Sequence, residues 1–587
     1  MKIILSHRSI PIKYEKEWVY FGSSFTKQNN VELRLKGKRI DTSKESKLEF
    51  KKKKYIFINW LEKLRLKNKD KIEWWISQMS CRNNLHSKIF LNICQLYVIN
   101  KIIKKKKNIL IVCEDIFLLN LLAKNLSKKN VYIKFDLLLH ILKFFEIFLL
   151  FLSGLYLQCK FLYDLIKLKA FCIFNQKKKQ KELLGNLVLF HHALEFNVRS
   201  YSCRYFKQLP DWFKKNGKQV YKIPWFFNKK ISFKFLRDLK NNNFLIFDEW
   251  LNITDYIYIY KIFFKSFFTI KKNTYIDNIN LDSLILKEKL LHLQQPSVFF
   301  LRYIPALKKM TKNVTSITSY DHFENMPFEH PLRFGLKQLN IKTKNVGFFH
   351  SLVSKNFFVY SHSKSEWQSK IKPEIVLCTG KLSKSFLIKN NIPKKIIRIA
   401  AALRQNKIKK TKIKGKNIMI LLPLEKLSSI ELLSKIYLNR KKIFKDINAK
   451  IVVKPHPLAN LTMLLKQTRI NKIPHNWIIS KKSINEELTK SFCCITMSSA
   501  SAFDAIINKN IVISIKSDFD LHDNYLDILD DKNSFINSIE IDKLNNVLKN
   551  IYYLKNNEYI KSFKEIRKNL LGGLNFVNSS NLKSFII

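Results

Sequence analysis

The sequence has little cysteine, and its cysteines are not arranged as metal ligands. Nine cysteines are scattered over 587 residues without a CxxC pair, and only Cys493 and Cys494 are neighbours. This pattern excludes a cysteine-based metal site and predicts buried thiols in a reducing cytoplasm. A signal peptide is also missing from the first residues, because Met1–Ser9 predicts an opening strand.

Acidic residues are scarce, with 45 Asp and Glu against 107 Lys and Arg and a formal net charge of +62. Such a balance suggests nucleic-acid binding, but the sequence lacks a helix-turn-helix, RRM or zinc-finger pattern. The lysines are spread along nearly the whole chain among Asn, Ile and Phe. This mixture is what a strongly A/T-biased genome would encode at tolerant surface positions. We therefore predict no nucleic-acid partner, although a cationic surface is attracted to anionic lipid head groups.

The remaining composition is that of a globular protein with several domains, with 46% hydrophobic and 13% aromatic residues. Short apolar runs alternate with helical spacing, which predicts an α/β fold with parallel sheets. In the first unit, Tyr55–Ile58 and Asn108–Cys113 are expected to be strands. No internal repeat is present. The predicted segments are an N-terminal α/β unit (1–135), an apolar helical segment (136–180), a second α/β unit (181–344), a third α/β unit (345–565) and a tail (566–587).

The apolar segment contains a run, Leu137–Leu157, that is long enough to cross a bilayer. Three polar residues, His140, Lys143 and Glu146, lie in its first half, and charge at the bilayer centre is costly. We favour a helix, or a helix pair, that lies in the membrane interface. A helix buried in protein and a true membrane span remain the alternatives.

Two predicted strand ends in the third unit carry residues suited to phosphate binding. The strand in Ala449–Pro457 (AKIVVKPHP) ends in Lys454 and His456, which two prolines hold in place. The strand in Cys493–Asp504 (CCITMSSASAFD) ends in the hydroxyls of Ser498, Ser499 and Ser501, just before a predicted helix. A turn with an exposed histidine and ordinary helix capping are the structural alternatives, but capping needs only one serine.

A histidine and two acids lie near the boundary between the second and third units. His350 follows the predicted strand Asn345–Phe349, and Glu324 and Glu329 flank Met326-Pro327 just before it. Either carboxylate could act as the general base for an acceptor hydroxyl, although each could also be a solvated surface acid. No Asp-x-Asp triplet ends a strand, since Asp518–Asp520 lies in a predicted loop. We therefore predict no bound metal.

These motifs together resemble known families. KPHP followed by a Ser-Ser strand end resembles the HP and SS motifs of bacterial polysialyltransferases and capsule Kdo transferases. The order of motifs is also similar to that of CDP-glycerol glycerophosphotransferases. A family of bacterial surface carbohydrate biosynthesis proteins resembles most of the chain. That resemblance rests on Trp74-Trp75, Ser80–Phe90, Tyr205-Phe206, Leu209-Pro210, Glu324–Glu329, Cys378–Gly380, Ala401–Arg404, KPHP and the serines.

The resemblance implies two Rossmann-like domains facing a cleft, a GT-B-like fold, with the N-terminal unit and the apolar segment as additions. The domain at 181–344 would bind the acceptor, and the domain at 345–565 would bind a nucleotide sugar, with a CMP- or CDP-linked donor favoured. His456 would be a phosphate ligand or general acid, Ser498 and Ser499 phosphate ligands, and His350 the N-domain histidine. We also expect Lys454, Ser501 and Gly380 in the donor site. Ser351 stands where relatives have glycine, and its side chain limits how closely the backbone can approach a ligand at this point.

The predicted function is therefore a metal-independent glycosyltransferase without a cofactor, in which a nucleotide sugar is the donor substrate. Its acceptor would be a growing surface polysaccharide or a lipid-linked glycan. The protein is expected in the cytoplasm, peripheral to or anchored in the inner face of the cell membrane. A catalytically silent, membrane-associated scaffold with the same fold is the alternative, and a nucleotide-sugar epimerase is conceivable.

Overall fold

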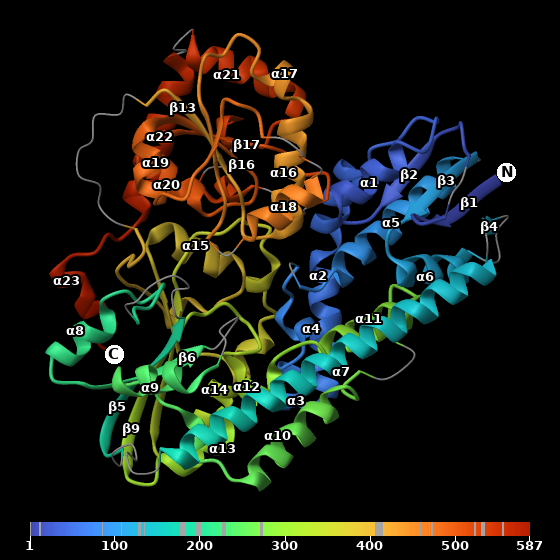
Figure 1. The fold of residues 1–587 in the computed structure, drawn as a ribbon. Helices are drawn as coiled ribbons and strands as arrows, with labels where there is room; N and C mark the ends of the chain where they lie inside the picture. The colour runs from blue at the N-terminus through green and yellow to red at the C-terminus, as the bar shows by residue number, and fades with distance from the viewer. Residues whose placement is uncertain are drawn as a thin grey trace.

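The structure is a computed structural model, and it contains three α/β units and one long surface helix. In Figure 1 the N-terminal unit lies at the right, the middle unit at the lower left and the C-terminal unit at the top. The described residues are 2–10, 13–84, 86–106, 108–126, 131–133, 136–175, 183–193, 201–225, 231–270, 274–405, 415–457, 459–468, 470, 473–519, 521, 524–529, 534–553 and 557–587.

The N-terminal unit is built on a four-stranded parallel sheet. Its strands, in spatial order, are β2 (Trp18–Phe21), β3 (Asn108–Cys113), β1 (Lys2–His7) and β4 (Val131–Ile133). Its helices are α1 (Phe25–Glu32), α2 (Ser43–Lys67), α3 (Ile72–Trp75), α4 (Gln78–Cys81), α5 (Ile89–Lys105) and α6 (Ile116–Leu126). The strand predicted at Tyr55–Ile58 is wrong, because these residues lie inside α2. Four apolar residues fit one helix face or one strand equally well, and the neighbouring residues continue the helix.

The middle unit contains a six-stranded parallel sheet. The strands, in spatial order, are β12 (Ile397–Ile399), β11 (Ile375–Cys378), β10 (Lys342–Phe349), β9 (Val314–Asp321), β5 (Gly185–Ala193) and β6 (Gln219–Trp225). Its α-helices are α8 (Leu209–Lys215), α9 (Phe233–Asn241), α10 (Ile253–Ser266), α11 (Asp282–His292), α12 (Ser297–Leu301), α13 (Tyr303–Met310), α14 (His330–Leu336) and α15 (Lys381–Lys389). A 3-10 turn, η2 (Phe247–Glu249), and a short antiparallel pair, β7 (Tyr275–Ile276) and β8 (Ile279–Asn280), complete it.

The C-terminal unit contains a five-stranded parallel sheet. Its strands, in spatial order, are β15 (Trp477–Ile479), β14 (Ile451–Lys454), β13 (Asn417–Leu421), β16 (Ser491–Thr496) and β17 (Ile511–Ser514). Its helices are α16 (Lys426–Leu438), α17 (Arg440–Ile443), α18 (Leu461–Thr468), α19 (Ile484–Lys490), α20 (Ser501–Ile507), α21 (Leu544–Tyr552) and α22 (Asn557–Gly573). The strands are nearly continuous apolar runs, as expected where helices cover both faces of a sheet.

The boundary between the last two units differs from the predicted one. We expected residues 345–565 to form the third unit, but β11 pairs with β10, and β12 pairs with β11, in the middle sheet. The middle unit therefore continues to β12, and the third sheet starts at β13. The predicted tail is also part of the fold. Phe585 is fully buried, its carbonyl accepts from the Tyr320 hydroxyl, and α23 (Ser579–Leu582) lies beside the middle unit in Figure 1.

Two parallel sheets of Rossmann type with an additional N-terminal α/β unit confirm the predicted fold class. The N-terminal unit shares one hydrophobic core with the middle unit. Phe90 stacks on Phe57 at 4.6 Å and on Phe358 at 4.9 Å between ring centroids. A buried ion pair between Arg82 and Glu366 joins the same two units, with 2.8 Å between Nη2 and Oε1. These contacts fix the N-terminal unit against the middle sheet.

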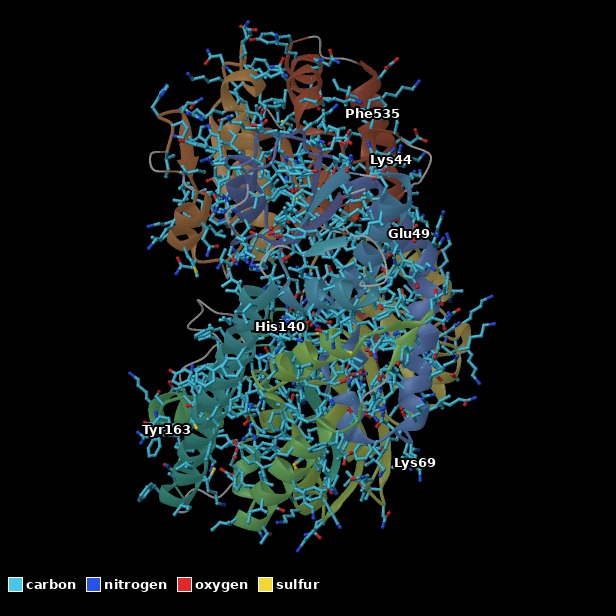
Figure 2. The ribbon with its side chains drawn as sticks, turned by 90° about the vertical axis from the view of Figure 1, so that its right-hand side faces the viewer. Lys44, Glu49, Lys69, His140, Tyr163 and Phe535 are labelled. Atoms are coloured by element: carbon cyan, nitrogen blue, oxygen red, sulfur yellow. The ribbon has the colours of Figure 1, made fainter. Side chains whose placement is uncertain are left out.

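The apolar segment is one helix, α7 (Asp136–Phe174), which runs diagonally across the molecule in Figure 1. Among the described residues it is the one helix long and apolar enough to cross a membrane, and its most apolar 18-residue stretch has a mean hydropathy of 1.9. Only 11% of its most apolar stretch is buried. Figure 2 shows the helix along one side of the molecule, with Tyr163 at the edge. The exposed large apolar side chains of α7 are those of Leu137, Leu138, Ile141, Phe144, Phe145, Phe148, Leu149, Phe151, Leu152, Leu155, Tyr156, Leu162, Tyr163, Ile166, Ile173 and Phe174.

Candidate active site at the junction of the middle and C-terminal sheets

The strand order of each Rossmann-type sheet marks the place where ligands bind. In open α/β sheets this place is the carboxyl edge at the point where the strand order reverses. In the C-terminal sheet the order reverses between β13 and β16, and in the middle sheet between β5 and β9. The loops after β5, β10, β12 and β14 meet at one place. Arg204 after β5 contacts His456 after β14, and Arg404 after β12 contacts His350 after β10. This junction is the candidate active site.

His350 and Glu324, which the sequence analysis named as separate candidates, lie together on the middle-unit side of the junction. The Nε2 atom of His350 is 3.0 Å from Oε1 of Glu324. Arg404 lies on the other side of the ring, with Nη1 3.5 Å from Nδ1. Since an arginine can only donate, Nδ1 accepts and Nε2–H donates to Glu324. Burial lowers the pKa of His350, Glu324 raises it, and the Arg404 and Arg204 charges lower it further.

The Tyr205 ring holds the His350 ring in place. The two rings stack at 4.0 Å between centroids, with 24° between their planes. Tyr205 also packs edge-on against His322 at 4.5 Å. His322 is completely buried, and neither of its ring nitrogens has a hydrogen-bond partner among the described residues. Burial and the neighbouring histidines keep the pKa of His322 well below its usual value, so its imidazole is neutral.

Glu329 occupies a different position from Glu324. Its side chain is completely buried and pairs with Arg333, with 2.8 Å between Nη2 and Oε2. Its carboxylate accepts the backbone N–H groups of Glu324 and Asn325, the second at 3.1 Å. Asn325 has a positive φ of 52°, a backbone conformation that is costly outside glycine. Glu329 therefore fixes the loop that carries Glu324, and its buried carboxylate is not placed to accept a proton from an acceptor.

His456 approaches the junction from the C-terminal unit. It follows β14, and its Nε2 atom is 3.3 Å from Nη2 of Arg204 in the middle unit. Burial and the charges of Arg204 and Arg404 lower the pKa of His456 to about 3. The neutral ring accepts from Arg204 at Nε2 and therefore carries its proton on Nδ1. Such a ring suits hydrogen bonding to a phosphate oxygen better than proton donation.

The serines after β16 are partly arranged as the sequence predicted. Ser498 has a φ of 44°, and its Oγ is buried without a partner among the described residues. A buried hydroxyl without a partner is costly, which makes Ser498 suited to contact a ligand. Ser499 instead accepts the backbone N–H of Ser501 at 3.4 Å, an ordinary local contact.

Two further predicted donor-site residues have structural contacts. Lys454 donates from Nζ to the carbonyl of Lys482 within the C-terminal unit. Gly380 lies against the C-terminal segment, where an added Cβ would be 1.9 Å from the carbonyl oxygen of Gly573. Its lack of a side chain is therefore explained by this backbone contact.

Arg204 and Arg404 are site residues that the sequence argument did not identify. The Arg204 backbone N–H donates to the carbonyl of Ala193 at 3.1 Å, which places Arg204 beside the end of β5. The loop that carries Arg404 is tied to the C-terminal segment by Ala402, whose N–H donates to the carbonyl of Asn575 at 2.7 Å. Burial and the Arg204 charge lower the pKa of Arg404. Arg404 ends the Ala401–Arg404 segment of the family resemblance and Arg204 precedes its Tyr205-Phe206 segment, which is the sequence feature that could have identified them.

Asp504, in helix α20 of the C-terminal unit, is an acid within electrostatic reach of Arg404. Burial raises the pKa of Asp504, and the charges of Arg404 and Lys207 oppose that rise.

The guanidinium groups of Arg204 and Arg404 converge on His456, which comes from the opposite sheet. In the part of the chain that the structure describes, no group of three or more His, Cys, Asp or Glu side chains could hold a metal ion.

Comparisons with known proteins give similarity in overall shape only. No protein-family model matches the chain, and no curated protein matches it. The chain is similar to UDP-GlcNAc 2-epimerase of Methanocaldococcus jannaschii, with 12% identity and a TM-score of 0.37 over 69% of this chain and 98% of the epimerase. It is also similar to the same enzyme of Neisseria meningitidis, with 10% identity and a TM-score of 0.37 over 69% of this chain and 98% of the enzyme. A mutant of S. aureus TarM in complex with UDP is 15% identical, with a TM-score of 0.31 over 50% of this chain and 58% of TarM.

Proposed function

We propose that the protein is a glycosyltransferase that moves a sugar from a nucleotide-activated donor to a growing surface glycan or a lipid-linked acceptor. The observation that carries this proposal is the convergence of Arg204, Arg404 and His456 at the junction of two parallel sheets. Paired guanidinium groups match the oxygens of a diphosphate, and they bind it most strongly where burial weakens competition from water. A CMP- or CDP-linked donor is the form that the motif resemblance favours.

The residues divide into a donor side and an acceptor side. Arg204 and Arg404 would hold the phosphates and stabilise the charge that develops on the leaving group, with Nδ1–H of His456 as an additional donor. The Ser498 hydroxyl would meet the same ligand from β16. Glu324 would accept the proton of the acceptor hydroxyl. Among the described residues, His350 contacts only the Oε1 atom of Glu324, so the Oε2 atom of Glu324 is left for the acceptor hydroxyl.

Nucleotide binding is the first test of this proposal. Purified protein is heated with CMP, CDP, UDP, GDP or ADP, and the unfolding temperature is measured. A nucleotide at a hundred times its dissociation constant stabilises the folded state by about 2.7 kcal/mol. We expect one base to give a clear shift that is lost in His456→Ala and in Arg204→Gln. His475→Ala is the matched control, because His475 is exposed in the same unit, and it should keep the shift.

A protein that none of these nucleotides stabilises, at concentrations well above those of cells, would not be a nucleotide-sugar transferase. The silent scaffold would then be the better explanation. A shift that survives in both His456→Ala and Arg204→Gln would show that nucleotide binds elsewhere in the molecule.

We propose further that α7 lies flat in the inner face of the membrane and does not cross it. A helix of 39 residues is about 58 Å long, against a hydrocarbon core of about 30 Å. Side chains along α7 hold it to the protein. Gln158 donates to the carbonyl of Leu293 at 2.6 Å, and Lys169 donates to that of Leu251 at 2.6 Å. Crossing the bilayer would break these contacts, whereas lying in the interface buries the exposed apolar face.

Helix α10 widens this apolar face. It carries the exposed side chains of Ile253, Ile257, Tyr258 and Phe264, and Phe268 follows its end. Burial and the neighbouring Cys159 of α7 raise the pKa of Tyr260 in α10, so the two helices, which are drawn near each other in Figure 1, come close at this point. The protein would therefore meet the membrane with two helices rather than one.

Vesicle flotation tests the membrane contact. Replacing Phe144 and Leu149 by Ser is expected to lower the partition into vesicles at least about tenfold, since each fully buried apolar side chain is worth about 1.5–3 kcal/mol. The control replaces Leu424 and Leu438 by Ser, because these leucines are 55% and 58% exposed in the C-terminal unit. Equal partition of the two double variants would contradict the proposed role of α7.

A further inference from the structure

A second cationic site lies in the N-terminal unit and shares no residue with the candidate active site. It is an open recess of about 460 Å³ between the end of β1 and helix α1, and its lining consists of Arg8, Ser9, Lys27, Asn30, Leu33 and Arg34. Arg8 and Ser9 follow β1 directly, so the recess is at the carboxyl edge of a parallel sheet, where such sheets bind ligands.

The recess carries three positive charges, and none of its lining residues is acidic. Arg34 is held by the backbone, since Nη2 donates to the carbonyl of Arg8 and Nε donates to that of Asn30 at 3.2 Å. Lys27 is partly neutralised by Glu114, with 2.7 Å between Nζ and Oε1. The two arginines have no such carboxylate partner among the described residues, and their charges repel each other unless an anion lies between them.

Two buried polar atoms of the recess lack a hydrogen-bond partner among the described residues. They are Nε of Arg8, a donor, and Oδ1 of Asn30, an acceptor. A buried polar atom without a partner costs about 1–3 kcal/mol. Both side chains line the recess, so a ligand in it would reach these atoms once the two side chains turn toward it. A phosphate monoester or a phosphate carrying a glycerol hydroxyl has the acceptor oxygens and the hydroxyl to pair with them.

The recess lies next to the proposed membrane helix. Burial raises the pKa of Glu146 in α7, and the charges of Lys287, Lys27 and Arg8 oppose that rise. Lys27 and Arg8 are therefore within electrostatic reach of Glu146 in α7, and the exposed side chains of Phe144 and Phe145 precede Glu146 in the same helix. Leu33, which is 72% exposed, adds an apolar side chain to the recess itself. Cationic and apolar surfaces meet here, as they do at a lipid headgroup and its chains.

We propose that this recess binds the phosphate of an anionic lipid headgroup at the membrane surface on which α7 lies. The inference rests on the membrane contact proposed above. The arginine forks would grip the phosphate oxygens, and the acyl or prenyl chains would run toward the apolar side of α7. The N-terminal unit would thereby position the protein, or its lipid-linked acceptor, relative to the active site.

The test compares binding of the full-length protein to phosphatidylcholine vesicles with and without phosphatidylglycerol. We expect the preference for anionic vesicles to fall at least about tenfold when Arg8 and Arg34 are both replaced by Gln. Replacing both by Lys keeps the charge but removes the fork, and we expect the same loss. Replacing Lys441 and Lys442 by Gln is the control, because both are exposed on α17 in the C-terminal unit.

A preference retained in the Lys variant would mean general attraction to negative charge and would overturn the proposal. Binding of inorganic pyrophosphate is measured with the same variants. If the variant with Arg8 and Arg34 replaced by Gln loses pyrophosphate binding without any change in vesicle binding, the recess takes a soluble phosphate, and this result would also overturn the proposal. Asn30→Asp is a second variant for the case that the arginine variants misfold. It adds a negative charge to the recess and is expected to lower the preference for anionic vesicles. If the unmodified protein binds no vesicle, both membrane proposals fail, whereas a failure confined to the recess leaves the α7 contact and nucleotide binding intact.

Discussion

Replacing Glu324 by Gln is expected to lower kcat/KM for sugar transfer by about 10²–10⁴-fold, the usual contribution of a general base. Gln keeps the shape of the side chain and an oxygen that accepts from His350 at the site of the 3.0 Å contact. It cannot take a proton from the acceptor hydroxyl. The measurement is nucleotide release from the nucleotide sugar whose base stabilises the unmodified protein. Nucleotide-dependent stabilisation should not change, because the arginines hold the donor.

Glu15→Gln is the control for this experiment, since Glu15 is an exposed acid of the N-terminal unit. It should leave both turnover and nucleotide binding unchanged. If Glu324→Gln retains turnover close to that of the unmodified protein, another group accepts the proton, and Asp504 in helix α20 of the C-terminal unit becomes the first residue to examine. If it also loses the nucleotide shift, Glu324 belongs to the donor site.

The residues that sequence predicted best are those whose position depends on a single strand. His350, His456 and Ser498 each follow an apolar run that ends abruptly, and each lies at the carboxyl end of the strand expected. The strand and its end are encoded within a few neighbouring residues, so a local pattern is sufficient.

Contacts between distant segments could not be predicted in the same way. The pairing of β11 with β10 depends on which sheet edge is available, and the sequence of β11 does not encode that choice. Arg204 and Arg404 are 200 positions apart and belong to loops without a motif of their own. Their approach follows from the order of the strands in the middle sheet and from the return of the C-terminal segment to Ala402. Glu324 and Glu329 were equivalent in sequence, and only burial distinguishes the half-buried Glu324 from the completely buried Glu329 that fixes the loop.

The buried arginine behind the Glu324 loop gives the largest expected change in stability. Arg333 is completely buried and bonds two carboxylates, with 2.6 Å from Nε to Oδ2 of Asp321 and 2.8 Å from Nη2 to Oε2 of Glu329. Burial raises the pKa of Glu329, and the Arg333 charge is the strongest group opposing that rise. Removing Arg333 would leave two acids in the interior beside each other without a counter-charge.

Arg333→Leu is therefore expected to lower the free energy of unfolding by about 3–5 kcal/mol, the cost of breaking a buried ion pair on one side. The exposed Arg398, replaced by Leu, should change it by less than about 0.5 kcal/mol. In the variant the pKa of Glu329 is expected to rise further above its ordinary value, because the charge that opposes the effect of burial is gone, and protonation of Glu329 relieves the cost. The deficit should be small at acidic pH and grow as the pH rises from the ordinary pKa of a glutamate toward the raised pKa of Glu329. Thermal unfolding across pH, with hydrogen exchange of residues 323–329, measures both effects. A deficit that does not depend on pH would mean that lost packing, and not the buried charge, causes the instability, and the Glu324 loop would then keep its protection from exchange.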